Sequence, residues 1–202
     1  MLDYAMNYPD KLGNALLEHI EMVVITLASS LLLASILTIL SVYSRIVSKA
    51  LIYIFSVIYS IPSLALFALL IPVTGLGQST AIIVLVIYNQ YLLLRNFMAG
   101  LNEVDPAIME AAKGMGMSSM QLLFKIKLPL SKKSIFTGIR LSLVSTIGIA
   151  TIAASINAGG LGSLLFDGLR TMNVYKILWG SLLAAGLAVG TNALLSKLET
   201  KM

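Results

Sequence analysis

Long apolar runs without a charged side chain dominate the pattern of this sequence. Four intervals free of Asp, Glu, Lys and Arg run from Met22 to Ser44, Ala50 to Leu94, Leu141 to Phe166 and Ile177 to Ser196. A helix needs about 20 mainly apolar residues to cross roughly 30 Å of hydrocarbon. Each interval is long enough, so the pattern predicts helices that span a membrane.

The second interval is too long for one span. It contains Pro72, Gly75 and Gly77, which are typical of a turn, and Ser79, which can cap a following helix. Division at this turn gives five predicted spans, at about 22–42, 48–71, 79–99, 135–157 and 176–197. The sequence therefore predicts an all-α integral membrane protein whose 202 residues form a single transmembrane domain.

Basic residues divide the connecting segments into two unequal groups. One side of the membrane holds three, which are Lys11, Arg170 and Lys176. The other holds eleven, which are Arg45, Lys49, Arg95, Lys113, Lys125, Lys127, Lys132, Lys133, Arg140, Lys197 and Lys201. Lys and Arg near the ends of spans stay on the cytoplasmic side. We therefore expect the N-terminus outside, the C-terminus inside, and residues 100–134 as one large cytoplasmic loop.

Composition agrees with this assignment and excludes several functional classes. Hydrophobic residues make up 58% of the chain and charged residues only 11%, which is more apolar than a soluble core of this size requires. The net charge of +5 is explained by topology rather than by a nucleic-acid partner, because the basic residues lie between apolar segments. The sequence has no cysteine, so disulfides and thiolate chemistry are excluded.

No constellation for catalysis is visible. No carboxylate interrupts a span, and a phosphate-binding GxxxxGK[ST] loop is missing. The single histidine, His19, lies beside Glu18 and Glu21 in a polar segment, and we expect it to be exposed. The sequence therefore predicts a non-enzymatic protein without a metal or cofactor.

The cytoplasmic loop carries local signals for a short helix. Asp105 can cap its start, and Pro106 suits a first turn because the N–H that proline lacks is not needed there. Gly114 and Gly116 can end the helix in the left-handed conformation.

A second short helix is predicted to follow. Ser118 and Gln121 match a capping box that starts it, and Pro129 is expected to stop it. Its apolar side chains can pack on the bundle, and four methionines offer adaptable contacts to a partner: Leu122, Leu123 and Ile126, then Met109, Met115, Met117 and Met120. An amphipathic segment on anionic lipid, with Lys125 and Lys127 at the headgroups, is equally compatible with these residues.

The same loop resembles the EAA signature of ABC importer permeases, which reads E-A-A, three residues, G, nine residues, I-x-L-P. The chain matches every fixed position, at Glu110, Ala111, Ala112, Gly116, Ile126, Leu128 and Pro129. The resemblance implies the five-helix, MetI-like fold of type I importer permeases, with coupling helices that insert into a groove on a cytoplasmic ATPase dimer. It implies Glu110 as a charged or capping contact, Ala111 and Ala112 as close-packing surface, and Gly116 as the turn.

Other segments are similar to permeases for quaternary-ammonium osmoprotectants: Ile61-Pro-Ser-Leu-Ala65, Gly114-Met-Gly-Met117, and Ile149 to Ala154 followed by Ala158 to Gly162. The likeness covers about residues 15–195. It implies import of glycine betaine, carnitine or choline across a bacterial cell membrane, driven by a separate ATPase. Further implied partners are an extracytoplasmic substrate-binding protein, expected as a separate chain, and a second permease subunit, identical or related.

Two alternatives to this function stay open. Methionine-importer permeases share the helical plan and the loop, so another small solute is compatible with the sequence. A tension-gated channel, which needs no ATPase, is an alternative from a different class.

Polar side chains within the spans are the candidates for a translocation pathway: Tyr59, Ser60, Pro62, Asn89, Gln90, Ser155 and Asn157. Such groups face protein or water rather than lipid, so hydrogen bonds that merely hold the helices together are the alternative. Tyr59 and Tyr88 can meet a quaternary ammonium through their ring faces, or they can belong to an interfacial aromatic belt. Pro62 is expected to kink its helix.

Small residues in the last span suggest close helix contacts. Gly186 and Gly190 form a GxxxG pair, and Gly180 with Ala184 repeats the spacing. Packing within the bundle and contact with a second permease subunit are both compatible with this pattern.

Overall fold

The apolar runs form the long helices of the molecule. In the computed structural model, which describes residues 2–199, four helices are long and apolar enough to cross a membrane: α2 (Pro9–Ser41), α5 (Gln78–Asn102), α9 (Lys132–Ile152) with its 3₁₀ extension η2 (Ala153–Ile156), and α11 (Val174–Glu199). A fifth candidate span combines α3 (Arg45–Ser60) with α4 (Ser63–Thr74). The described residues contain no strand, so the protein is all-α.

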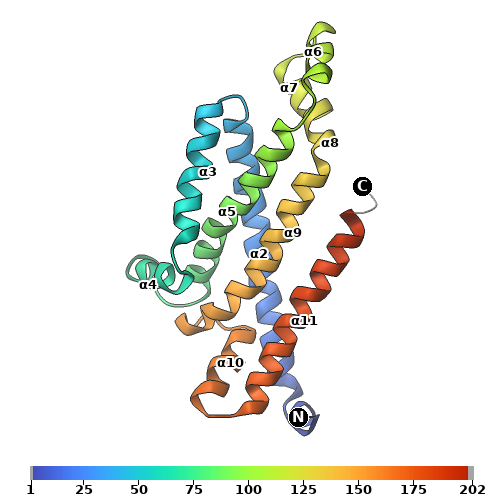
Figure 1. The fold of residues 1–202 in the computed structure, drawn as a ribbon. Helices are drawn as coiled ribbons and strands as arrows, with labels where there is room; N and C mark the ends of the chain where they lie inside the picture. The colour runs from blue at the N-terminus through green and yellow to red at the C-terminus, as the bar shows by residue number, and fades with distance from the viewer. Residues whose placement is uncertain (1, 200–202) are drawn as a thin grey trace.

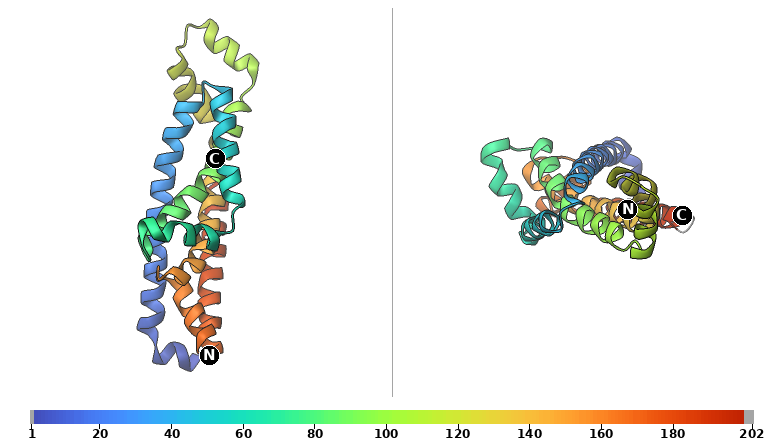
Figure 2. Two further views of the ribbon diagram at one scale, coloured as in Figure 1. Left: turned by 90° about the vertical axis from the view of Figure 1, so that its left-hand side faces the viewer. Right: turned by 90° about the horizontal axis from the view of Figure 1, so that it is seen from above.

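The remaining elements are short: α1 (Leu2–Asn7), α6 (Pro106–Gly114), α7 (Ser119–Gln121), the π-helix η1 (Leu122–Lys127), α8 (Leu128–Leu130) and α10 (Leu161–Arg170). They gather at the two ends of an elongated bundle (Figures 1 and 2). One end carries α6, α7 and α8, and the opposite end carries α1 and α10. We refer to the end that carries α6 as the coupling end.

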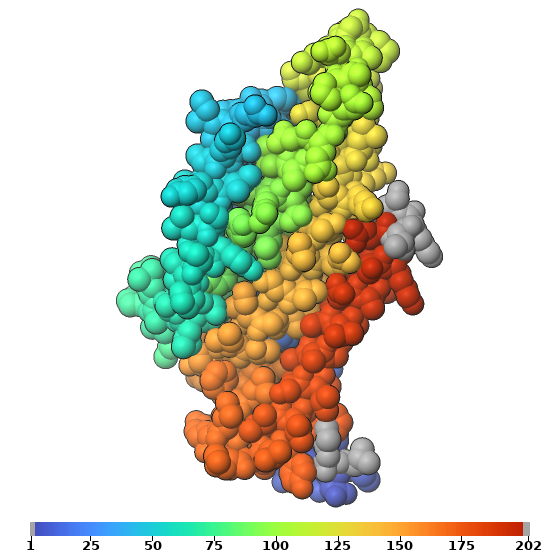
Figure 3. All heavy atoms as spheres, viewed as in Figure 1, coloured from blue at the N-terminus to red at the C-terminus, as the bar shows by residue number. Residues whose placement is uncertain are grey.

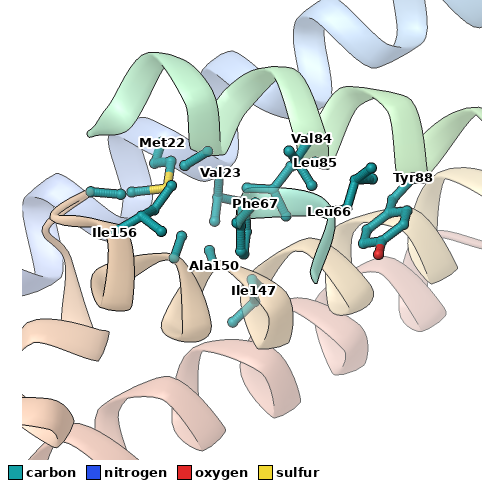
Figure 4. Close-up of a cluster of buried hydrophobic side chains, with 13 residues drawn as sticks. Met22, Val23, Leu66, Phe67, Val84, Leu85, Tyr88, Ile147, Ala150 and Ile156 are labelled. Carbon is teal, nitrogen blue, oxygen red and sulfur yellow. The ribbon is translucent and has the colours of Figure 1, made fainter. Parts of the chain in front are cut away.

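The main apolar core lies between α2, α4, α5 and α9 (Figure 4). Each helix contributes side chains that are at least nine-tenths buried, including Met22, Val23, Leu66, Phe67, Val84, Leu85, Ile147 and Ala150. Phe67 is fully buried. The short helix α4, which projects sideways from the bundle in Figure 1, is therefore anchored by its own side chains.

The second predicted span is sharply broken. We expected one kinked helix over 48–71, but α3 and α4 meet at 99°. Ile61 and Pro62 are both extended, with ψ of 133°. For Ile61 the cause is the proline ring, which disfavours helical geometry in the residue before it. The Tyr88 hydroxyl donates a hydrogen bond to the Ile61 carbonyl, which the break leaves without a helical partner.

The turn after α4 differs in detail from the prediction. Pro72 lies inside α4 rather than at its end, because a proline removes only its own N–H and Gly75 N–H still donates to the Ile71 carbonyl (2.8 Å). Ser79 does not cap α5. Gly75 and Gly77, with φ of +82° and +115°, turn the chain, and the Thr80 hydroxyl bonds the Gly75 carbonyl.

The prediction that His19 is exposed was wrong. Helix α2 begins at Pro9, so the polar segment continues the first span, and His19 lies on the helix face that packs against α9. His19 is fully buried, and its Nε2 donates to the Ile147 carbonyl (3.2 Å). The neighbouring Glu18 Oε2 accepts the Gly160 N–H (2.9 Å). Glu18 therefore holds the segment that links α9 to α10, while the adjacent His19 bonds α9 itself.

Packing within the chain explains only part of the small-residue pattern in α11, which lies along the outside of the bundle (Figure 3). Gly180 is buried, and a Cβ there would lie 2.9 Å from Leu165 Cγ, so its size permits the contact with α10. Gly186 and Gly190 are exposed, with no atom within 4 Å of where a Cβ would lie. The intramolecular explanation is therefore wrong for the GxxxG pair.

Candidate functional site

Helix α6 begins as the local sequence predicts. Asp105 Oδ1 accepts the Ala107 N–H (2.8 Å), and Pro106 occupies the first turn. An N-terminal carboxylate also complements the positive end of the helix dipole. The start of the helix is therefore fixed by residues adjacent in sequence.

Helix α6 ends in a Schellman motif. Gly116 N–H donates to the Lys113 carbonyl (2.9 Å), and Met117 N–H donates to the Ala112 carbonyl (3.2 Å). Gly116 has φ +79°, as predicted for the turn. Gly114 remains helical, so its predicted left-handed conformation was wrong.

The second short helix begins with the predicted capping box. Ser118 N–H donates to Gln121 Oε1 (2.9 Å), and Gln121 N–H donates to Ser118 Oγ (3.3 Å). The Tyr43 hydroxyl, from the segment that joins α2 to α3, donates to the Ser119 carbonyl (3.0 Å). This contact ties the tip of the loop to the bundle.

Pro129 does not stop the second helix. The chain stays helical through α7, η1 and α8, and Leu128 N–H donates to the Leu123 carbonyl, five residues earlier. The wider π turns relieve the clash between a proline ring and the carbonyl four residues before it. A nearly continuous helical path therefore leads from the tip of the loop into α9.

The signature residues divide between an outer and an inner surface. Glu110, Ala111 and Pro129 are exposed, Ile126 and Leu128 are half-buried, and Ala112 is buried. Of the four methionines, Met115 and Met120 are the exposed pair. The exposed tip therefore presents the Glu110 carboxylate beside flexible apolar side chains.

The base of the loop is packed rigidly on the spans. Leu123 is buried with Met98 and Leu101 of α5, and Leu122 is also buried. A Cβ on Gly100 would lie 2.6 Å from Ser134 Cβ, so α5 and α9 approach closely here. Motion of the tip would therefore be transmitted to both helices.

Positive charge concentrates around the loop. Burial lowers the pKa of Lys127, and the charge of Lys113 acts in the same direction.

Three pathway candidates lie at the α3–α4 break. Ser60 and Pro62 are exposed, while the half-buried Tyr59 ring packs against the rings of Tyr88 (5.6 Å) and Tyr91 (5.1 Å) from α5. The break therefore exposes polar groups beside an aromatic cluster.

Asn89 and Gln90 lie instead inside the bundle. Asn89 Nδ2 donates to Ser30 Oγ (3.1 Å) of α2 and Thr146 Oγ1 (2.9 Å) of α9. Gln90 Nε2 donates to the Ser30 and Val86 carbonyls. In this conformation both amides hold helices of the bundle together.

Ser155 and Asn157 are exposed at the opposite end of the molecule. They line a cavity of about 370 Å³ together with Phe166 and Asp167 of α10. Asp167 binds Lys176 Nζ (2.6 Å) and Arg170 Nη2 (3.3 Å), and the hydrogen bond from Lys176, followed by that from Arg170, lowers its pKa. The structure therefore separates the pathway candidates into groups at the break, in the core and at this end.

The sequence analysis did not predict the face of α2 that bonds Asn89 and Gln90 through Ser30. Thr26, Ser30, Ala34 and Thr38 recur every four residues along α2, and all four are buried. This stripe of small residues was a visible signal for the α2 face that meets α5 and α9.

Comparisons with known proteins agree with this geometry. The family model described as "Binding-protein-dependent transport system inner membrane component" matches residues 30–198. A carnitine transport permease protein, OpuCB of Listeria monocytogenes, is 40% identical over 77% of this chain and 72% of its own length. A choline transport system permease protein, OpuBB of Bacillus subtilis, is 33% identical over 92% of this chain and 85% of its own.

A Helicobacter pylori protein, ergothioneine transport permease/ergothioneine binding protein EgtU, is 41% identical over 63% of this chain but only 23% of its own length. Among solved structures, an inward-facing MetNI methionine ABC transporter chain has a TM-score of 0.85 at 20% identity, with 95% of each chain covered. At that identity the likeness shows the fold, which is that of MetI-like importer permeases.

Proposed function

Because this chain belongs to the family of binding-protein-dependent transport system inner membrane components, we propose that it forms the translocation pathway of an ATP-driven importer for quaternary-ammonium osmoprotectants. It is a multi-pass membrane protein. In the proposal it lies in a bacterial cytoplasmic membrane, N-terminus outside, and leaves ATP hydrolysis to a separate ATPase dimer.

The observation that carries the proposal is the coupling loop. All seven signature residues fall between the start of α6 and the end of α8, in a loop whose tip is exposed and whose base is packed on the spans. Such an element suits the transfer of motion from a soluble motor to the spans. Glu110 is exposed and forms no ion pair within residues 2–199, so its carboxylate is available to the ATPase.

The substrate class rests on the relatives. Permeases named for carnitine and choline are 33 to 40% identical to most of this chain. The Tyr59, Tyr88 and Tyr91 cluster beside the exposed Ser60 supports the same class, since a quaternary ammonium is attracted to aromatic ring faces. The proposed cycle also includes a separate substrate-binding protein and a second permease subunit, for which the exposed Gly186–Gly190 face of α11 is a candidate contact.

Co-purification tests the coupling role. Glu110→Lys should lose most of the ATPase that co-purifies with the wild-type chain, because the exposed carboxylate becomes a cation on an already basic tip. Asp10→Lys makes the same charge change on an exposed residue at the opposite end and should retain the ATPase. Equal retention by both variants would remove Glu110 from the interface.

Uptake by the reconstituted importer tests the substrate. Glycine betaine, carnitine or choline should stimulate ATP turnover, and each should inhibit uptake of the others. Methionine should neither stimulate turnover nor inhibit their uptake. Stimulation by methionine alone would assign the chain to another small solute, and ion conductance by the purified chain without ATPase would assign it to a channel.

A further inference from the structure

An apolar groove opens at the coupling end of the bundle. It has a volume of about 370 Å³, with walls from α2, α5 and α9 and a roof from η1 and Leu128. Leu31, Phe97 and Ile139 line the walls, and Phe124, which is 51% exposed, lies at the roof. The groove is separate from the exposed tip of α6 and from all the pathway candidates.

The chemistry of the groove changes along α2. Leu31, Ser35 and Thr38 are spaced by four and three residues and share one helix face. With 1.5 Å of rise per residue, Thr38 lies about 10 Å closer to the coupling end than Leu31. Two polar side chains of the α2 wall therefore lie nearer the coupling end than Leu31, whereas the rest of the lining is apolar.

Thr38 has an unused hydrogen-bonding group on the α2 wall of the groove. The residue is only 6% exposed, and its hydroxyl has no partner in the part of the chain that the structure describes. The hydroxyls of Thr137, Thr146 and Thr191 donate to the carbonyl four residues earlier, as helical threonines commonly do. Thr38 lines the groove, so a rotation about χ1 can turn its hydroxyl toward an acceptor there.

A cation lies about one helical turn before the groove along α9. Lys132 precedes the lining residues Ile135 and Ile139 by three and seven positions, so all three share one face of α9. Lys132 is exposed and forms no ion pair with any described residue. A cation, a hydroxyl and an apolar channel follow one another in the order of the phosphate, ester and acyl chain of a phospholipid.

We propose that this groove binds one anionic phospholipid from the leaflet on the coupling end, with its phosphate at Lys132, an ester at Thr38 and an acyl chain along Leu31 and Ile139. The bound chain contacts Phe124 of η1, so the lipid holds the path from the coupling helices against the spans.

Native mass spectrometry of the purified full chain tests the proposal with phosphatidylglycerol and phosphatidylcholine of identical acyl chains. The wild type should retain one phosphatidylglycerol under conditions that remove phosphatidylcholine. Ser35→Trp fills the groove from an exposed position and should lose this lipid, whereas Ser29→Trp, exposed on the same helix but outside the groove, should keep it.

A second pair of variants tests the headgroup contact. Lys132→Gln should weaken retention of phosphatidylglycerol about fivefold, and Lys49→Gln, an exposed lysine away from the groove, should not. Retention of phosphatidylglycerol by Ser35→Trp, or equal retention of both lipids by the wild type, would overturn the proposal. The measurement needs neither ATPase nor substrate, so its outcome is independent of the proposed transport function.

Discussion

Gly116 sets the angle between α6 and α7 through its backbone alone. Its φ of +79° lies in the left-handed region, and no atom lies within 4 Å of where a Cβ would be. Conformation rather than space therefore requires glycine at this position.

Gly116→Ala should disturb coupling without preventing membrane insertion. An L-residue in the left-handed region costs about 1–2 kcal/mol, so the turn should open and substrate-stimulated ATP turnover should fall severalfold. Gly114→Ala is the matched control, because Gly114 is helical, has open space around it, and should tolerate alanine. Unchanged turnover in Gly116→Ala would show that coupling does not depend on this turn.

Asp167 should give the end opposite the coupling loop a pH-dependent stability. Its pKa is lowered by the hydrogen bonds from Lys176 and Arg170. The stabilisation is therefore present above the ordinary carboxyl pKa of about 3.9 and is lost as pH falls through the lowered value. Thermal unfolding between neutral and acidic pH should show a loss in the wild type that Asp167→Asn lacks.

Asp10→Asn is the control for this effect. Asp10 is exposed at the same end and forms no ion pair among residues 2–199. If it flattens the pH profile as much as Asp167→Asn, the profile reports general charge rather than the bond between α10 and Lys176.

The break between α3 and α4 is the element-level feature that the sequence described least well. A proline at position 62 predicted a kink, and the structure shows a 99° turn. Its size depends on Tyr88 and on the burial of Leu66 and Phe67, which belong to contacts distant in sequence.

Pro62→Ala should loosen this break, because alanine no longer restricts Ile61 to extended geometry. Spin labels on cysteines at the exposed positions Tyr53 and Leu69 can report the change, since the chain has no native cysteine. The distance distribution should broaden toward longer values. Pro72→Ala, inside α4, should leave it unchanged, and a narrow unchanged distribution in Pro62→Ala would show that tertiary contacts alone hold the break.

Local signals predicted part of the local structure correctly but failed at Ser79, Gly114 and Pro129, and contacts distant in sequence explain a further failure. The caps at Asp105 and Ser118 and the turn at Gly116 depend on residues a few positions apart, so the sequence was sufficient. The burial of His19 depends on α9, where its hydrogen-bond partner Ile147 lies 128 positions further along the chain. The helix continues through Pro129 by means of π turns, which the pattern of apolar residues in the sequence does not predict.

The whole molecule is asymmetric in charge, with its basic loop at the end that carries α6 (Figure 1). Because Lys and Arg are in excess on this side, we propose that it faces the cytoplasm. In the same proposal α10 and the Asp167 cluster lie outside.

Single cysteines test this orientation in intact cells. Met172→Cys, beyond α10, should react with a membrane-impermeant thiol reagent, whereas Ser119→Cys in the coupling loop should react only after permeabilisation. Both positions are exposed, so access depends on the side of the membrane. The reverse pattern would invert the topology and place the coupling loop beyond the reach of any cytoplasmic ATPase.

The π-helix η1 lies between the exposed tip of the loop and α9, so its geometry sets the orientation of the tip. A π turn contains more residues than an α turn, and one residue corresponds to about 100° of rotation in an α-helix. Deleting a single residue within Leu122–Lys127 would let the path revert to α geometry and remain continuous, and the Glu110 surface would keep nearly the same orientation, because each residue of a π turn rotates the chain by less than a residue of an α turn. A change of one residue in the length of this segment can therefore be absorbed within η1 without turning the exposed tip relative to the spans.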